Sequence, residues 1–254
     1  RKIDHKILVK EMGELKKEAI FYEEKASKKA TKDRTKINDA DALIYTEGKT
    51  DLKHLKKAAT KLKFNLNLAF GTEEKKGGSS DLYKMCGYYA RTPQEKKCIF
   101  VFDRDEEQII KDLNQKTENG KDYQDWGNNV YSFYLPQPRN CSDITHFISI
   151  ESFYADNEIK TKNNKGRRMY LSNEFNKKSG RHLNEDLICT DKTKFKRDKI
   201  CIIDSEVFDK DNNNVALSKD DFAEAILKNE AGFNNFEYFS FQDIFNIISE
   251  IIKS

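Results

Sequence analysis

The chain has 254 residues, of which 35% are charged and 37% hydrophobic, and its formal net charge at pH 7 is +3. This balance is typical of a soluble protein with one large domain or one core domain and an appendage. No apolar run approaches the roughly 20 residues that cross a bilayer, and no secretory segment is visible, so we expect no membrane association. The five cysteines form no C-x-x-C pair, which argues against structural zinc and indicates a reduced, cytoplasmic protein.

The first segment, residues 1–39, predicts a long helix over 3–30 followed by a charged linker. Its apolar residues recur at alternating spacings of four and three and form one narrow seam: Leu8, Met12, Leu15, Ala19, Tyr22 and Ala26. Such a seam needs a partner, which is another helix of this domain, a second copy in a homo-oligomer, or an upstream region. Because the chain begins at Arg1 and not at Met, we expect that upstream sequence is missing.

The second segment, residues 40–155, alternates between strand and helix patterns. Hydrophobic strands are predicted over 42–46, 64–70, 97–102 and 130–135, and helices from Thr50, over 81–90 and over 106–113. Residues 148–154 predict a short strand that enters a helix. This alternation implies right-handed crossovers, and therefore an α/β fold with a Rossmann-like parallel sheet flanked by helices.

The third segment, residues 156–254, predicts a basic insert and C-terminal helices that complete the domain. Residues 160–199 contain 13 Lys and Arg against 5 Asp and Glu, which indicates either a surface for a polyanion or a solvated lysine-rich insert. Residues 200–203 predict one more strand. Ser218 and Asp221 form a capping box before a helix, and the isoleucines of 244–252 give the apolar face of the last helix.

Acidic residues follow two of the predicted strands. Glu47 comes after the first strand, and Asp103 and Asp105 come after the third. The carboxyl ends of parallel strands meet at one edge of a sheet, where ligands bind. Carboxylates gathered there repel one another unless a cation lies between them, and oxygen ligands of this kind suit Mg²⁺. Asp51 lies one helical turn beyond Glu47, where it either joins such a site or stabilises the helix N-terminus.

These motifs resemble the TOPRIM domain of topoisomerases, bacterial primases, RecR-type repair proteins and nucleases of the overcoming-lysogenization-defect (OLD) family. The resemblance covers about residues 40–155 and rests on Glu47-Gly48 before Lys49-Thr50-Asp51, and on Asp103-x-Asp105. The nuclease branch fits best, because the Gly77-Gly78-Ser79-Ser80 loop and the Ile150-Glu151-Ser152-Phe153-Tyr154 segment resemble those of OLD-type and phage-defence nucleases. Topoisomerases and primases need large additional domains that this chain lacks.

The resemblance implies a divalent-metal-dependent endonuclease that acts in phage defence. Glu47, Asp51, Asp103 and Asp105 would hold two Mg²⁺ or Mn²⁺ ions, which together activate water and neutralise the phosphate. Glu47 would either ligate a metal or act as a general base. Glu151 would complete the catalytic set with Glu47, Asp103 and Asp105, or would pair with a cation of the insert.

The basic insert would bind the phosphate backbone of the nucleic acid, DNA or RNA. Transition-state stabilisation by a cation is expected in this reaction class, and the candidates lie in that insert: Lys160, Lys165, Arg167, Arg168, Arg181 and His182. A histidine such as His182 is more often a surface or core residue than a catalytic one. Tyr123, Trp126 and Tyr131 are candidates either for stacking on bases or for the core.

Two other functions remain open. The first is a non-catalytic TOPRIM scaffold in a repair or defence complex, and the second is an unrelated α/β phosphatase or phosphotransferase that uses the Asp-x-Asp pair.

OLD-type nucleases work with an ATPase, and no G-x-x-x-x-G-K-[ST] motif occurs here. We therefore expect the ATPase in a partner protein or in a missing N-terminal region.

Overall fold

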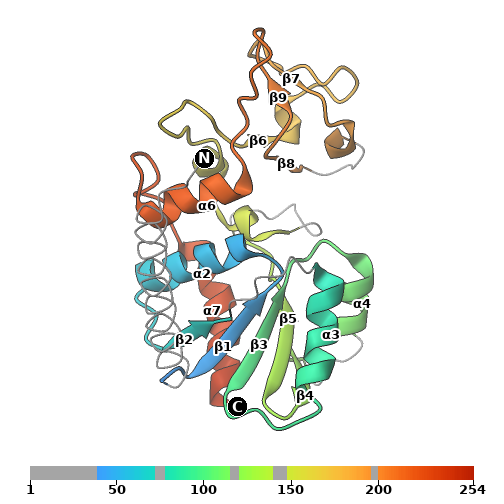
Figure 1. Ribbon diagram of the computed structural model, residues 1–254, viewed down its shortest axis with the longest axis vertical. Coiled ribbons are helices and arrows are strands. Elements are labelled where there is room, and N and C mark those ends of the chain that lie inside the picture. Colours follow the sequence, from blue (N-terminus) through green and yellow to red (C-terminus); the bar gives the residue numbers. More distant parts are fainter. Residues whose placement is uncertain (1–38, 72–77, 115–119, 140–147, 196–199) are drawn as a thin grey trace, which may run out of the picture.

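A computed structural model describes residues 39–71, 78–114, 120–139, 148–195 and 200–254 (Figure 1). The predicted N-terminal helix, its linker as far as residue 38, and residues 72–77 of the glycine-containing loop lie outside the described residues. Within the described part, no helix is long and apolar enough to cross a membrane.

The main sheet has five strands in the order β2-β1-β3-β5-β4. The parallel strands are β1 (Ala42–Thr46), β2 (Leu68–Phe70), β3 (Lys97–Phe102) and β5 (Val130–Tyr134), while β4 (Gln124–Gly127) is antiparallel to β5 at the edge. The predicted α/β class with a mostly parallel sheet is therefore confirmed. Because β2 and β3 pair with opposite sides of β1, the strand order reverses between β1 and β3, and a crevice for a ligand is expected at such a switch point.

Helices cover both faces of this sheet. The helices α2 (Lys49–Lys61) and α7 (Gln242–Lys253) lie on one face, and α3 (Ser79–Tyr89) and α4 (Glu107–Asn114) lie on the other (Figure 1). Strand β3 is apolar on both sides: Ile99 and Val101 join the α2/α7 core, whereas Phe100 and Phe102 join the α3/α4 core. A strand that is buried on both faces has a continuous run of hydrophobic residues, and this run is why β3 could be predicted from the sequence.

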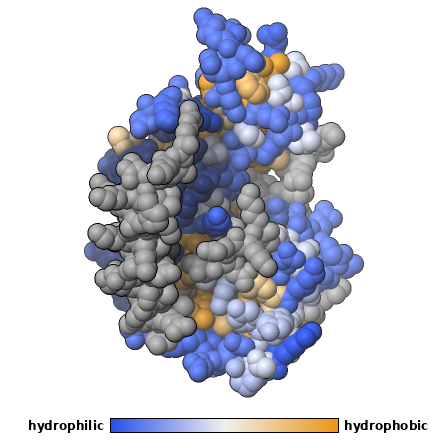
Figure 2. Space-filling view, in the orientation of Figure 1, coloured by the Kyte–Doolittle hydropathy of each residue, from blue (hydrophilic) through white to orange (hydrophobic). Residues whose placement is uncertain are grey.

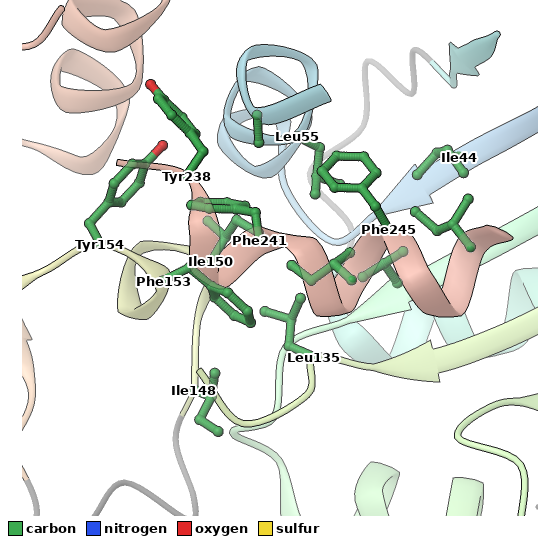
Figure 3. Close-up of a cluster of buried hydrophobic side chains, with 14 of the residues drawn as sticks. Ile44, Leu55, Leu135, Ile148, Ile150, Phe153, Tyr154, Tyr238, Phe241 and Phe245 are labelled. Atoms are coloured by element: carbon green, nitrogen blue, oxygen red, sulfur yellow. The ribbon is translucent and has the colours of Figure 1, made fainter. Parts of the chain in front are cut away.

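The larger core lies between the sheet and α7 (Figure 3). Phe245 of α7 is fully buried and packs against Phe64, with ring centroids 4.7 Å apart. The isoleucines that the periodicity assigned to the inner face of this helix are buried, apart from the partly buried Ile252. The 3₁₀ turn η4 (Phe239–Phe241) leads into α7, and the ring of its Phe241 packs on that of Phe153, with ring centroids 5.3 Å apart.

Two predicted strands differ from the structure. The strand expected over 64–70 spans only 68–70, because Lys63 adopts a left-handed conformation (φ 52°) and the Phe64 N–H donates to Ala59 O (2.9 Å), which closes the end of α2. The alternation there reflects a turn and not a strand. The strand expected over 148–154 is an isolated bridge at Ile148 followed by the 3₁₀ turn η1 (Ile150–Phe153) and the short helix α5 (Asp156–Ile159).

The described part of the basic insert folds into a second, smaller lobe formed by residues 160–195 and 200–217, which we name the β6–β9 lobe (top of Figure 1). In it, β6 (Tyr170–Leu171) pairs with β8 (Ile202–Ile203), and β7 (Ile188–Cys189) pairs with β9 (Val207–Phe208); the turns η2 (Ser172–Glu174) and η3 (Lys192–Phe195) connect them. It has its own small core that includes Tyr170, Phe175 and Val207, under a mostly hydrophilic surface (Figure 2). The strand predicted over 200–203 is therefore β8, and it pairs inside this lobe and not in the main sheet.

The chain returns from the lobe through α6 (Lys219–Lys228). The predicted cap is confirmed, since the Asp221 N–H donates to Ser218 Oγ at 3.1 Å. Lys53 of α2 pairs with Asp220 and Glu224 of α6, each at 2.6 Å, which fixes the start of α6 beside the start of α2.

Candidate functional site

The tips of β1 and β3 bring two predicted site residues together. Glu47 follows β1, and its Oε1 accepts a hydrogen bond from the backbone N–H of Asp103, directly after β3, at 3.0 Å. The parallel register that pairs Thr46 with Val101 places both residues at the carboxyl edge of the sheet. The convergence expected from the sequence is therefore what the fold produces, and it occurs at the switch point.

Asp51 reaches the same edge from the first turn of α2. It is 9% exposed; its Oδ2 accepts from the Gly48 N–H at 2.9 Å and its Oδ1 from the Thr50 hydroxyl at 3.3 Å. A Cβ on Gly48 would lie only 3.3 Å from Asp51 Oδ2, so glycine leaves room for this carboxylate. The helix-stabilising role left open for Asp51 is therefore present, and it holds the carboxylate beside the strand tips.

Glu151 enters from η1 and is 1% exposed. Its Oε2 accepts from Lys219 Nζ at 2.8 Å and from Ser149 Oγ at 2.6 Å, whereas its buried Oε1 has no hydrogen-bond partner among the described residues. The ion-pair alternative left open for Glu151 is thus observed. Its partner comes from the first residue of α6 and not from the insert over 160–199.

The carboxylates perturb one another electrostatically. Burial raises the pKa of Glu47 to about 7, and the negative charges of Asp105 and Asp51 add to this rise. The hydrogen bond from the Asp103 N–H opposes it, since that bond favours the ionised form. Burial and the charge of Glu151 raise the pKa of Asp51 to about 6. Burial, then Asp51, Glu151 and Glu47, raise the pKa of Asp103 well above its usual value. The site therefore holds more carboxyl groups than the neighbouring protein cations can keep ionised.

Lys219 is the cation that sequence reasoning missed. Burial disfavours its charged form, yet Glu151, Asp103 and Asp204 together raise its pKa, so it is protonated at neutral pH. The same lysine keeps the pKa of buried Glu151 below its usual value against the effect of burial. In the sequence, Lys219 is one basic residue at a helix start, where nothing distinguishes it from the other lysines.

A buried histidine backs this cluster. His54 is 0% exposed; its Nδ1 lies 2.9 Å from the Tyr154 hydroxyl and its Nε2 has no partner among the described residues. Burial lowers its pKa to about 4, so the ring is neutral at pH 7. Because its ring is neutral, His54 adds no positive charge to balance the carboxylates. The side chain of Tyr154, its hydrogen-bond partner, extends from the core on the same side as that of Tyr238 (Figure 3).

Asp105 is exposed next to these residues, and its charge contributes to the raised pKa of Glu47. Nevertheless, no three His, Cys, Asp or Glu side chains in the described part of the chain are arranged so that they could hold a metal ion as placed. Among the described residues the carboxylates thus gather at one edge without a ready-made chelate, and Glu47, Asp51 and Glu151 each accept a hydrogen bond from the protein.

The basic residues expected to grip nucleic acid divide into two groups. Arg168 is 5% exposed, pairs with Glu174 (2.8 Å) and Glu185 (3.2 Å) and stacks on Tyr170 at 3.8 Å, so it belongs to the interior of the β6–β9 lobe. Arg167 Nε donates to Ala216 O at 2.7 Å. A buried, paired guanidinium is not available to a phosphate, and this is a correction for Arg168.

The other three expected phosphate contacts are more accessible. Lys165 and Arg181 are exposed, and Lys160 is partly buried. Of the aromatic candidates for base stacking, Tyr123 and Tyr131 are buried, and the Trp126 Nε1–H donates to Ser132 Oγ at 2.7 Å. Tyr123 and Tyr131 therefore follow the core alternative.

Comparisons with protein-family models, with curated proteins and with solved structures found no match for this chain.

Proposed function

We propose that this chain is a divalent-metal-dependent nuclease of the TOPRIM type. One observation carries the proposal: Glu47, Asp51, Asp103 and Glu151 converge at the carboxyl edge of a parallel sheet, at its switch point, with Lys219 as their cationic neighbour. In this group two buried carboxylates, Asp51 and Glu151, and two half-buried ones, Glu47 and Asp103, outnumber the neighbouring cation Lys219. Titratable groups perturbed in this way are concentrated at functional sites.

The donor set suits Mg²⁺ or Mn²⁺. Hard divalent cations take carboxylate oxygens, and the buried Oε1 of Glu151 lacks a partner among the described residues. A bound cation would favour the ionised forms of Glu47, Asp51 and Asp103, whose pKa values burial and mutual repulsion raise. Glu47 and Asp103 would be its main ligands, with Asp51 and Asp105 completing a second position.

The protein residues would divide the remaining work. Bound metal would supply an activated water and charge neutralisation at the phosphate. Lys219, which donates to Glu151, would bind a non-bridging phosphate oxygen and stabilise the charge that develops there. Ser149 donates to the same Glu151 oxygen and so fixes its orientation.

The β6–β9 lobe would bind the phosphate backbone of the nucleic acid. Lys165 and Arg181 are exposed on it, and contacts of this type to the backbone are independent of sequence. A role as a phage-defence effector controlled by an ATPase, in a partner or in an upstream region, rests on the resemblance of the motifs to OLD-type nucleases.

The proposal is tested with Asp103→Asn and with Asp81→Asn as a control, an exposed first-turn aspartate of α3. We expect saturable Mn²⁺ binding by calorimetry in the native chain and in the control, and its loss in Asp103→Asn. Cleavage of single- and double-stranded DNA and of RNA in Mn²⁺ should follow the same pattern. Binding and cleavage unchanged in Asp103→Asn would refute the metal assignment.

A non-catalytic TOPRIM scaffold is the second candidate, and a specific observation favours it. The carboxylates of Glu47 and Glu151 already accept hydrogen bonds from Asp103 N–H and Lys219, and the described residues include no ready-made chelate. A scaffold predicts no Mn²⁺ binding in either the native chain or Asp103→Asn. The calorimetric comparison therefore separates the two candidates without an activity assay.

A further inference from the structure

The segment 215–217 connects the β6–β9 lobe to the residue that pairs with Glu151. Lys219 is the first residue of α6, and the chain enters this helix from the lobe through that segment (Figure 1). Leu217 and Met169 are both fully buried in the larger core, so the lobe joins the main body at this point. The conformation of the segment therefore sets where α6 begins and from where the Lys219 side chain extends.

Two adjacent arginines of the lobe hold this segment. The Leu217 N–H donates to Arg168 O at 2.8 Å, and Arg168 forms an isolated parallel bridge with Ala216. The Arg167 side chain adds to this attachment, since its Nε donates to Ala216 O at 2.7 Å and its Nη2 donates to the same oxygen. Two of the five N–H groups of this guanidinium are thus directed at one backbone carbonyl.

The backbone of Arg167 is itself fixed by a turn. The Arg167 N–H donates to Asn163 Oδ1 at 3.0 Å, and the Asn163 N–H donates to Arg167 O at 2.9 Å. Gly166 lies inside this turn with a positive φ of 75°, which a residue with a side chain would rarely adopt. The guanidinium therefore extends toward Ala216 from a backbone that is held on both sides.

We propose that Arg167 is a positioning residue for Lys219. By fixing the carbonyl of Ala216, it sets the start of α6, where Ser218 provides the cap. Lys219 follows the cap directly and reaches Glu151 Oε2 at 2.8 Å. The lobe thus determines the place of the cation beside the acidic cluster, in addition to offering exposed basic residues of its own.

This role differs from the phosphate contact that the sequence predicted for Arg167. An arginine that binds the substrate would contribute affinity, whereas one that fixes Ala216 O acts through Lys219. The catalytic consequence rests on the proposed nuclease function, because a displaced Lys219 would stabilise the charge on the phosphate less well. The loss of the ion pair between Lys219 and Glu151 does not depend on that function.

The test measures the reactivity of the Lys219 amine in EDTA and without substrate. Acetylation by acetic anhydride, followed by mass spectrometry of peptides, is fast for an accessible neutral amine and slow for one held in an ion pair. Arg167→Met removes the guanidinium and keeps an unbranched side chain, while Arg167→Lys can still donate to Ala216 O. The matched control is Arg91→Met, which changes an exposed arginine outside the lobe.

Two other lysines report whether Lys219 alone is released. Lys194 donates to Ile202 O at 3.2 Å inside the lobe, and Lys53 of α2 pairs with Glu224 of α6 at 2.6 Å. Unfolding of the lobe would raise the acetylation rate of Lys194, and detachment of α6 from α2 would raise that of Lys53. Their rates therefore separate a positioning role from loss of the fold.

We expect Lys219 to be acetylated about tenfold faster in Arg167→Met than in the native chain and in Arg91→Met, on the scale of one lost charge-assisted hydrogen bond. Lys194 and Lys53 should keep their native rates, and Arg167→Lys should bring Lys219 most of the way back to its native rate. An unchanged Lys219 rate in Arg167→Met would overturn the inference, as would an equal rise at Lys194 or Lys53.

Cleavage kinetics give an independent readout under the proposed nuclease function. Arg167→Met should lower kcat about tenfold and leave KM nearly unchanged, because Lys219 acts on the charge that develops in the transition state. A higher KM with unchanged kcat would make Arg167 a phosphate contact and overturn the positioning role. If the native chain cleaves no nucleic acid, the nuclease proposal fails, and the acetylation rates still determine whether Arg167 positions Lys219.

Discussion

Asp51→Asn should stabilise the metal-free protein at neutral and alkaline pH. Asp51 is 9% exposed, and burial with the charge of Glu151 raises its pKa from 3.8 to about 6. The folded chain therefore binds this proton more tightly than the unfolded chain. The free energy of unfolding consequently falls as the pH rises from about 4 to 6, and the penalty is constant above that.

The size of the effect follows from the shift. One pKa unit corresponds to about 1.4 kcal/mol, so a shift of about two units costs the ionised folded chain about 3 kcal/mol at pH 8 and about 1 kcal/mol at pH 4.5. Asparagine is neutral and keeps an oxygen that can accept from the Gly48 N–H, as Asp51 Oδ2 does now. We expect Tm in EDTA to rise by about 6–12 °C at pH 8, at about 2–4 °C per kcal/mol, and by about a third of that at pH 4.5.

The assay is thermal unfolding followed by circular dichroism, with Asp81→Asn as the control. Asp81 occupies the same position of α3 that Asp51 occupies in α2, the third residue after a glycine cap, but its side chain is 63% exposed. The control should change Tm by little at either pH. A lower or unchanged Tm for Asp51→Asn at pH 8, or an equal gain at both pH values, would refute the electrostatic reasoning.

Three further outcomes are expected. Lys219→Met should lower the free energy of unfolding by about 2–3 kcal/mol in urea titrations, because Glu151 is then buried without its cation, and combining it with Glu151→Gln should restore most of this loss; additive losses would contradict the pairing. Phe245→Ala should cost about 3–5 kcal/mol, since the side chain is fully buried in the core, and a loss below 1 kcal/mol in the same titrations would contradict that packing. Tyr154→Phe should cost about 1–3 kcal/mol by leaving the ring nitrogen of buried His54 unpaired, and unchanged stability would show that this bond contributes nothing.

The strands and helices of the main sheet could be predicted from the sequence because their signals are local. Strand β3 is buried on both faces, so it is a continuous apolar run. The last helix, α7, carries isoleucines at helical spacing. Ser218 caps α6, because its Oγ accepts a hydrogen bond from the N–H of Asp221, three residues further along the chain. The gathering of Glu47 and Asp103 was also predictable, because parallel strands always place their carboxyl ends at one edge.

Short pairings and turns were not predictable in this way. Strand β4 has four residues and no apolar alternation, so only its pairing with β5 makes it a strand. The Phe64–Phe70 alternation looked like a strand, yet a left-handed residue at Lys63 ends the preceding helix there. Phe64 packs on Phe245 of the last helix, a contact between residues far apart in the sequence that the local pattern cannot reveal.

The charges of the site show the same division. The convergence of Glu47, Asp51 and Asp103 could be expected from the sequence, because Glu47 and Asp103 each follow a strand and Asp51 lies in the first turn of a helix. Glu151 lies in a 3₁₀ turn where a strand was expected, so its place in the cluster did not follow from the strand pattern. Which cation joins them depends on how the elements pack. Lys219 donates to Glu151, 68 positions away in the chain, while Arg168 of the basic insert donates to Glu174 inside the lobe. Long side chains reach partners that lie in other elements, so their pairing depends on how those elements pack and not on neighbouring residues.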